Sequence, residues 1–149
     1  MYSRILVAVD GSPAGNAALR HAIDLAKASG AALRIAHVVD MGLTPLAAEL
    51  ALDLHARSDA RRQAGRAVLD AAASVVAASG LQAASDLLET GAPTEKPADA
   101  IVELASAWPA DLILTGTHGR TGVARLFLGS VTNDVARRSK IPVLIVPAP

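Results

Sequence analysis

Short apolar runs alternate along the chain with longer segments in which apolar residues recur at helical spacing. Runs of this kind, closed by turn residues, predict β-strands, and the longer periodicity predicts amphipathic helices. The expected strands are Arg4–Val9, Leu33–Val39, Leu81–Glu89, Asp111–Thr115 and Pro142–Val146. Arg4–Val9 is almost entirely apolar, which favours burial on both faces of a sheet. The mixed polarity of Leu81–Glu89 favours a sheet edge.

The helices are expected between these strands. In the first helix, Ser12 is the expected N-cap, Pro13 the first helical residue and Gly30 the end. The later helices are predicted over about Ser58–Ser79, Pro97–Ala107 and Ser130–Ser139. Their expected inward residues are Ala64, Val68, Ala72 and Val75, then Ile101, Leu104 and Ala105, then Val131 and Val135. Residues 40–57 are less regular, and Thr44-Pro45 suits the start of a short helix through Leu46, Leu50 and Leu54.

Alternation of strand and helix throughout predicts an α/β fold with an open, five-stranded parallel sheet, as a single domain over residues 1–149. Right-handed crossovers then place helices on both faces of the sheet. Ligands of such sheets bind outside the carboxyl ends of the strands. Three segments are expected to meet there: Asp10 after the first strand, Val38-Val39 after the second and Gly116 after the fourth.

The strongest candidate for chemistry lies at that edge. It is Gly116-Thr117-His118-Gly119, followed after nine residues by Gly129-Ser130. Glycines let a backbone approach a ligand closely, and consecutive N–H groups that end at a helix N-terminus form an anion site. Residues 116–130 are therefore predicted to form a phosphate cradle, with turn chemistry alone as the simpler alternative.

Several polar residues of the cradle have two interpretations. The Ser130 hydroxyl can donate to a phosphate oxygen, and the same residue is the expected N-cap of the last helix. Arg120 and Arg125 either neutralise phosphates or face solvent. His118 could touch phosphate, although a solvent-exposed position is the more common one for a histidine in such a loop.

Composition narrows the classes of function. Of the 149 residues, 52% are hydrophobic and only 2% aromatic, so aliphatic side chains must build the core. The 14 basic and 14 acidic residues balance, which argues against a nucleic-acid binder. The absence of cysteine excludes disulfides and thiolate chemistry. No apolar run approaches the roughly 20 residues of a membrane span, and Ile5–Val9 is too short for a signal peptide, so a cytoplasmic protein is expected.

The glycine motif resembles the ATP-binding signature of the universal stress protein family. The opening Ile5–Ser12, the segment Gly116–Gly122 and the closing Pro142–Pro147 are also similar to that family, and the likeness covers the whole chain. The resemblance implies a Rossmann-like fold of the adenine nucleotide alpha hydrolase type, with strand order 3-2-1-4-5. It also implies a homodimer that pairs through the C-terminal strand, Val143–Val146. The loop Thr90–Pro97 is longer than is usual in the family.

The resemblance further implies a set of ATP contacts. In ATP-binding members the first-strand aspartate lies near ribose and adenine, main-chain groups after the second strand contact adenine, and the glycines and serine hold the phosphates. The matching residues here are Asp10, Val38, Val39, Gly116, Gly119, Gly129 and Ser130, flanked by Thr115 and Val131. The expected ligand is therefore ATP, with or without Mg²⁺.

The expected function is an ATP-binding module of stress response or signalling. The chain has no P-loop lysine, no dinucleotide fingerprint and no paired-histidine metal spacing, so at most slow ATP hydrolysis is expected and no catalytic residue is assigned. Asp10 can help to hold Mg²⁺ through water, but one carboxylate does not complete a catalytic site. Two alternatives stay open. One is a nucleotide hydrolase or an adenylyl- or phosphoryl-transfer enzyme of the related α/β type, and the other is a dimeric scaffold that binds no nucleotide.

Overall fold

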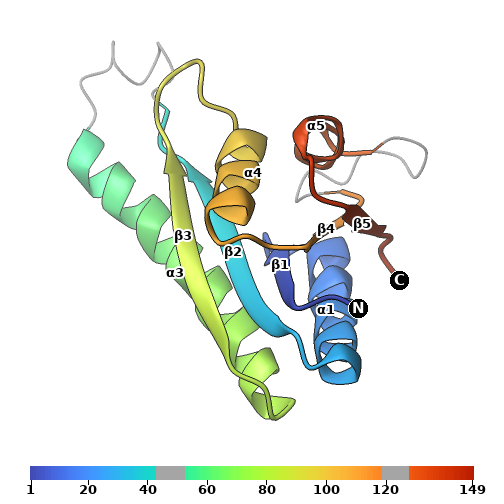
Figure 1. Cartoon of the computed structure of the whole chain (residues 1–149). Coiled ribbons are helices and arrows are strands. Elements are labelled where there is room, and N and C mark those ends of the chain that lie inside the picture. Colours follow the sequence, from blue (N-terminus) through green and yellow to red (C-terminus); the bar gives the residue numbers. More distant parts are fainter. Residues whose placement is uncertain (43–52, 119–127) are drawn as a thin grey trace.

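The computed structural model describes residues 1–42, 53–118 and 128–149 (Figure 1). The described strands are β1 (Arg4–Ala8), β2 (Ala32–Asp40), β3 (Ala83–Thr90), β4 (Leu112–Gly116) and β5 (Val143–Val146). The described helices are α1 (Pro13–Ser29), α3 (Leu54–Ala78), α4 (Pro97–Ala107) and α5 (Ser130–Arg138). The short helix expected through Leu46 and Leu50 lies outside the described residues, as do Gly119, Arg120 and Arg125.

The strands form one parallel sheet in the order β3-β2-β1-β4-β5. This confirms the expected α/β fold and its strand order. In the central strand β1, the side chains of Ile5, Leu6 and Val7 have no exposed surface, as its continuous apolar sequence predicts. β3 lies at one edge of the sheet, as its mixed polarity predicts, and begins at Ala83 rather than at Leu81.

Helices cover both faces of the sheet (Figure 1). α1 and α3 pack on one face, where Ile5 and Val7 enter the core, and α4 and α5 pack on the other, where Leu6 enters. Neighbouring residues of one strand reach opposite cores because side chains alternate along a strand. The switch in chain order between β1 and β4 therefore lies between two filled cores, with the carboxyl ends of the strands left to form a site.

The first helix begins and ends as its sequence predicts. The Ser12 hydroxyl accepts a hydrogen bond from the Gly15 N–H over 3.0 Å, and Pro13 is the first helical residue. Gly30 ends the helix at a φ of 70°, a left-handed conformation that favours glycine. The Ser12 cap places the start of α1 directly after β1, and the Gly30 cap sets its end.

α3 corrects the predicted start and the predicted inward face of the second helix. The helix begins at Leu54, capped by Asp53, whose side chain accepts from the Ala56 N–H over 3.1 Å. Its buried residues are Gly65, Leu69, Ala72 and Val76, so Ala72 alone of the predicted residues is buried, Val68 is half-buried, and Val75 is 46% exposed. The buried face of α3 is shifted by about one residue from the predicted face, because Gly65 approaches the sheet closely. A Cβ there would lie 2.6 Å from Val39 Cγ2 and 2.7 Å from Leu87 Cδ1.

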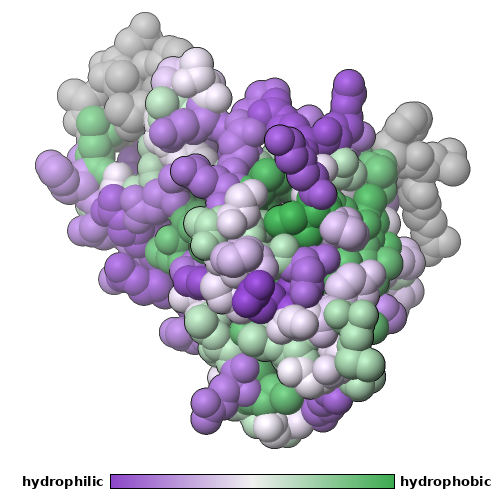
Figure 2. Space-filling model, viewed as in Figure 1, coloured by the Kyte–Doolittle hydropathy of each residue, from purple (hydrophilic) through white to green (hydrophobic). Residues whose placement is uncertain are grey.

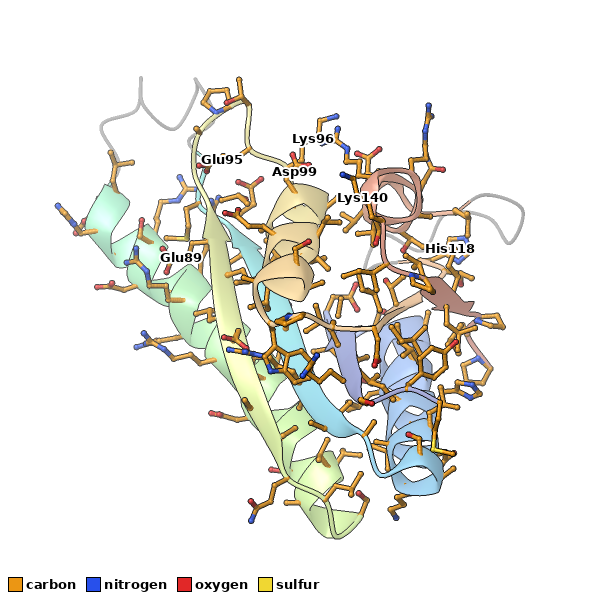
Figure 3. The ribbon with its side chains drawn as sticks, viewed as in Figure 1. Glu89, Glu95, Lys96, Asp99, His118 and Lys140 are labelled. Atoms are coloured by element: carbon orange, nitrogen blue, oxygen red, sulfur yellow. The ribbon has the colours of Figure 1, made fainter. Side chains whose placement is uncertain are left out.

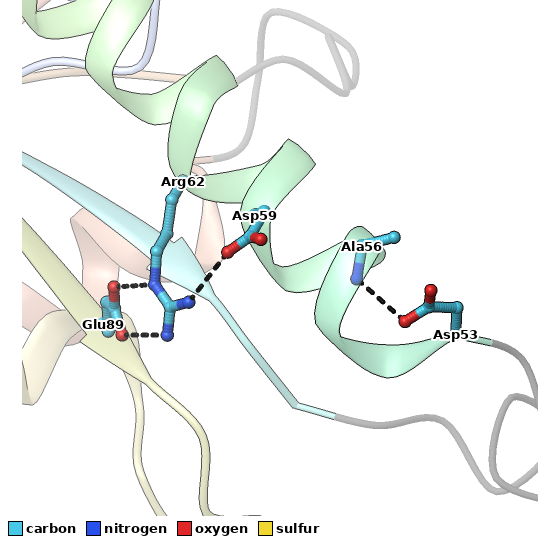
Figure 4. A network of polar contacts seen from close by, with 5 residues as sticks. All are labelled: Asp53, Ala56, Asp59, Arg62 and Glu89. Carbon is cyan, nitrogen blue, oxygen red and sulfur yellow. Dashed lines mark hydrogen bonds and ion pairs between the residues drawn. The ribbon is translucent and has the colours of Figure 1, made fainter.

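Charged side chains attach α3 to the adjacent edge of the sheet. Arg62 donates to both carboxylate oxygens of Glu89 on β3, over 2.6 and 3.2 Å, and also pairs with Asp59 one turn earlier (Figure 4). Hydrogen bonds from Arg62 hold the pKa of the Glu89 carboxyl below its usual range. This pair joins α3 to the carboxyl end of β3.

A second set of polar contacts lies at the amino ends of β1 and β4 and along the middle of β2 and β3. The Asp111 carboxylate accepts from the Ser3 N–H over 2.7 Å. Arg34 on β2 donates to both oxygens of Asp86 on β3, over 2.6 and 2.9 Å, and stacks 5.5 Å from the centre of the Trp108 ring. The hydrogen bonds to Asp86 raise the pKa of the Arg34 guanidinium above its usual range.

Candidate functional site

The carboxyl ends of β1, β2 and β4 surround a cavity of about 240 Å³ on the face covered by α4 and α5. In Figure 2 a hydrophobic area with hydrophilic residues around it lies between these two helices. The lining includes most of the predicted site residues. They are Asp10, Val38, Thr115, Gly116, Gly129, Ser130 and Val131. Residues more than one hundred positions apart in the sequence thus meet where the fold rule predicts a ligand.

Two of the predicted residues are not part of the described lining. Gly119 lies outside the described residues. The Val39 side chain is 7% exposed and packs toward Gly65 of α3, on the opposite face of the sheet. Val38 and Val39 are neighbours on one strand, so only one of their side chains can face the cavity.

The main chain of Val38 faces the cavity side of β2. The Ala36 carbonyl accepts from the Val9 N–H over 2.9 Å, so the polar groups of Ala36 point toward β1. Those of Val38, two residues on, point the same way, beyond the last residue of β1. The polar groups of Val39 point toward β3 instead, as do those of Met41, whose N–H donates to the Thr90 carbonyl.

Asp10 follows β1, between the ends of β2 and β4. Its Oδ1 accepts from the Ser12 N–H over 2.9 Å, which holds the carboxylate over the start of α1. The sequence analysis missed the part played by Gly15, where a Cβ would lie 2.7 Å from Asp10 Oδ1. Glycine at this helical position therefore makes room for the carboxylate.

The N-terminus of α5 forms one wall of the cavity. Gly129, rather than Ser130, is the N-cap, and no side chain of a described residue caps the helix. The Gly129 N–H donates to the Thr117 carbonyl over 2.8 Å, and the first intrahelical bond runs from the Asn133 N–H to the Gly129 carbonyl. The N–H groups of Ser130 and Val131 therefore stand at the open end of the helix, where an anion is favoured.

Thr132 is a cavity residue that the sequence analysis missed. It is 4% exposed, donates to the Gly116 carbonyl over 2.7 Å and lies 3.4 Å from Thr115 Oγ1. The predicted inward pair was Val131 and Val135, but Val131 is 37% exposed, and Thr132 is buried with Val135 instead. Residues three apart and residues four apart both lie on one face of a helix. Spacing alone therefore did not show whether Thr132 or Val131 is buried together with Val135.

Gly116 is required by packing as well as by any ligand. A Cβ at this position would lie 2.6 Å from the Ala14 carbonyl carbon and 2.7 Å from the Gly15 nitrogen. The end of β4 thus lies against the first turn of α1, and only glycine fits. The presence of this glycine is explained without a phosphate.

His118 is not the solvent-exposed residue that is common in such loops. It lines the cavity, its Nδ1 lies 3.0 Å from Thr117 Oγ1, and its Nε2 is buried without a hydrogen-bond partner among the described residues. His37, in contrast, is held by its ring nitrogen Nδ1, 2.7 Å from the Val9 carbonyl. The two histidines on the cavity wall therefore differ in how fully their ring nitrogens are paired.

Ion pairs join the helices on either side of the cavity. Lys96, directly before α4, lies 3.8 Å from Asp134 of α5, and Asp99 pairs with Arg138. Lys96 and Asp99 are labelled in Figure 3, at the start of α4. Within the described ranges, no group of three acidic, histidine or cysteine side chains has the spacing of a metal site. None of the described helices is long and apolar enough to cross a bilayer.

Comparisons with known proteins agree with this architecture. The model of the universal stress protein family matches residues 1–147. Universal stress protein MJ0531 of Methanocaldococcus jannaschii is 34% identical over 150 residues, covering all of this chain and 84% of that protein. A solved structure from the universal stress protein family of Burkholderia pseudomallei is 35% identical, covers 99% of this chain and 97% of its own, and has a TM-score of 0.77.

One further solved structure concerns a ligand. It is a universal stress protein in complex with cAMP, 32% identical to this chain, with 99% of each chain covered and a TM-score of 0.71. The family match spans nearly the whole sequence, and the structural likeness covers 99% of this chain. This chain belongs to the universal stress protein family.

Proposed function

We propose that this protein binds an adenine nucleotide, ATP in the first place, in the cavity at the carboxyl ends of β1, β2 and β4, and acts as a nucleotide-dependent module of the stress response. One observation carries the proposal. A single cavity joins an apolar end at β2 and α4 to the N-terminus of α5, which no side chain in the described part of the chain caps. A nucleotide has the same two parts, an apolar base and an anionic phosphate.

In this proposal each part of the nucleotide occupies its own region of the cavity. The base lies against Val38, Pro97 and Ile101, where the main chain of Val38 offers an N–H and a carbonyl. The ribose lies near Asp10, between β2 and β4. The phosphates lie at the N–H groups of Ser130 and Val131, where the helix dipole and the Ser130 hydroxyl favour an anion.

The cAMP complex of a related protein supports an adenine nucleotide as ligand. The cavity of about 240 Å³ is somewhat smaller than the range for small-molecule sites, roughly 300–1,000 Å³. This size suits a nucleoside and its first phosphate within the described part of the wall.

The residues present support binding more than rapid turnover. Asp10 is the only carboxylate on the described lining, and its Oδ1 already accepts from the Ser12 N–H. Such a carboxylate can hold a hydrated Mg²⁺ beside the phosphates, where the ion would neutralise phosphate charge. With no second carboxylate on that lining, the proposed ATP hydrolysis is slow at most.

The test is a calorimetric titration of nucleotide-free protein with ATP, with and without Mg²⁺. Gly129→Val should weaken binding at least tenfold, because its side chain enters the cradle, while its φ of −56° and ψ of 151° suit valine. Gly91→Val is the matched control, since a Cβ there meets no atom within 4 Å. Equal affinity of wild type and Gly129→Val would remove the phosphate assignment.

A thermal melt gives an independent readout. A ligand at 100 times its Kd stabilises the native state by about 2.7 kcal/mol, which raises the melting temperature by several degrees in a chain of this size. No shift with millimolar ATP contradicts the proposal and favours the scaffold alternative. Hydrolysis well above background that is lost in Asp10→Ala and His118→Ala supports the enzyme alternative instead.

We also propose a cytoplasmic homodimer that pairs through β5. The Pro142 and Val146 carbonyls accept from β4 and its following residue, so the polar groups of Val143 and Ile145 face the open edge of the sheet. Sedimentation should show a dimer for wild type and a monomer for Ile145→Lys, because a lysine blunts an edge strand. Val75→Lys, at an exposed apolar position on α3, is the control and should stay dimeric.

A further inference from the structure

β2 continues past the end of β1, and its last residues pair with a neighbouring strand on one side only. Val38 still pairs with Leu88 of β3, whereas β1 has already ended at Ala8. The pairing with β3 continues to Asp40 and holds this segment of β2 extended. The side of β2 that faces away from β3 is therefore open at Val38, which lines the cavity.

The Val9 carbonyl is the acceptor that a regular parallel ladder would give to the Val38 N–H. The Val9 N–H donates to the Ala36 carbonyl over 2.9 Å, and a residue that donates in this way normally accepts from the residue two positions further along the same strand. Between these two described residues that second bond does not form. The Val9 carbonyl lies instead 2.7 Å from His37 Nδ1. Because a carbonyl oxygen can only accept, Nδ1 carries the proton of this bond.

The His37 ring reaches this carbonyl beside α3, on the face of the sheet opposite the cavity. A Cβ on Gly65 of α3 would lie 3.2 Å from His37 Cδ2. Side chains alternate along a strand, and that of Val38 packs on the other face, with the core under α4 and α5. The imidazole therefore occupies the Val9 carbonyl while the space beside the Val38 main chain stays open to a ligand.

We propose that His37 is a positioning residue that sets the base preference of this cavity: by occupying the Val9 carbonyl, its imidazole leaves the Val38 N–H to donate to a ring nitrogen of adenine. The inference rests on the proposed function. The N–H and the carbonyl of Val38 point the same way, so they form a donor and an acceptor side by side. Adenine complements them with a ring-nitrogen acceptor beside an amino donor. Hypoxanthine has a carbonyl oxygen in place of that amino group, so it offers the Val38 carbonyl no donor there.

Amide hydrogen exchange of the nucleotide-free full chain tests the role of the imidazole without a ligand. In wild type the Val38 amide should exchange at least about tenfold faster than that of Ala36, which lies within the paired register of β1 and β2. In His37→Leu the released Val9 carbonyl can accept from the Val38 N–H, so the Val38 amide should exchange about tenfold more slowly than in wild type. His37→Asn has nearly the shape of leucine but keeps an N–H donor bonded to Cγ, so it should exchange as wild type does. His21→Leu, at an exposed position on α1, is the control and should also match wild type.

The second measurement compares the Kd of ATP with that of inosine triphosphate, which has the same ribose and phosphates but hypoxanthine as its base. Wild type should prefer ATP, and His37→Leu should reduce this preference by about three- to tenfold, the size of one hydrogen bond. His37→Asn and His21→Leu should keep the wild-type preference. A general loosening of the packing would weaken both nucleotides alike, so the ratio of the two Kd values separates positioning of the base from a merely structural role.

The outcomes separate the two proposals. ATP binding with the same base preference in wild type and His37→Leu overturns the role of His37 and leaves the proposed function intact. A Val38 amide that is already protected in nucleotide-free wild type overturns that role as well. Wild type that binds neither nucleotide overturns both proposals. If His37→Leu melts well below wild type, His37→Phe is measured in the same way, because it keeps an aromatic ring beside Gly65 and has no donor for the Val9 carbonyl.

Discussion

The Thr132 hydroxyl donates to the Gly116 carbonyl over 2.7 Å, with both residues buried. This bond joins the first turn of α5 to the last residue of β4, and so connects two walls of the cavity. Every residue of β4 is buried. The core therefore positions the helix N-terminus that faces the proposed phosphates.

Thr132→Val should destabilise the protein by about 1–3 kcal/mol, because it keeps the shape of the side chain but leaves the buried Gly116 carbonyl with only the longer, 3.4 Å hydrogen bond from the Thr115 hydroxyl. The same change should weaken ATP binding, since the first turn of α5 loses its attachment to β4. Urea unfolding and ATP titration measure the two effects. Wild-type stability in Thr132→Val would mean that the bond contributes nothing.

Thr90→Val should leave stability unchanged or increase it. Thr90 is as buried as Thr132, at 4% exposed, but its Oγ1 makes no hydrogen bond with any described residue. Replacing an unpaired buried hydroxyl by a methyl group removes a desolvation cost. The same series of urea unfolding measurements reports the result. A loss of stability comparable to that of Thr132→Val would show that the Thr90 hydroxyl has a hydrogen-bond partner.

Gly116→Ala should cost about 1–3 kcal/mol or more, because its Cβ would overlap the backbone of Ala14 and Gly15, which cannot move as a flexible side chain can. Gly91→Ala is the control, since its Cβ meets open space. Thermal unfolding distinguishes the two. Wild-type thermal stability of Gly116→Ala would contradict the close approach of β4 to α1. Loss of ATP binding in Gly116→Ala is uninformative about phosphate contact unless the fold is first shown to persist.

Glu89→Gln should reduce stability near neutral pH and have less effect in acid. Arg62 holds the pKa of Glu89 below its usual range, so the pair stabilises the fold above that range, and this contribution is lost as the pH falls through the lowered pKa. Both side chains are more than a third exposed, so salt should shrink the difference. Melting temperatures across acid to neutral pH measure it, with exposed Glu103→Gln as control. A difference that grows in acid would have the wrong sign.

The sequence predicted the strands and the position of the cavity because both depend on local patterns. Apolar runs closed by turn residues marked the strands other than β3, whose mixed polarity indicated a sheet edge, and the helix caps at Ser12 and Gly30 are where the pattern placed them. The carboxyl ends of parallel strands then fixed the edge of the sheet at which the predicted site residues meet.

The features that were missed depend on distances between segments. Which face of α3 is buried depends on the close approach of Gly65 to Val39 and Leu87. The spacing of apolar residues along the sequence does not reveal this approach. The closer donor to the Gly116 carbonyl is Thr132, sixteen residues away, and an amphipathic pattern does not distinguish that threonine from its valine neighbour. Ser130 was expected as the N-cap because serine favours that position, but the cap is Gly129, whose N–H is used by the Thr117 carbonyl.

The contact of the Asp111 carboxylate with the Ser3 N–H lies at the amino ends of the strands, away from the cavity. The cavity has residues of its own that hold the fold together, because Gly116 packs against α1 and Thr132 bonds to β4. Other lining positions, such as Ser130 and Val131, are exposed and make no such contact with the described residues. Changes meant to alter what the cavity accepts should therefore be made at these exposed positions, where they leave the core intact.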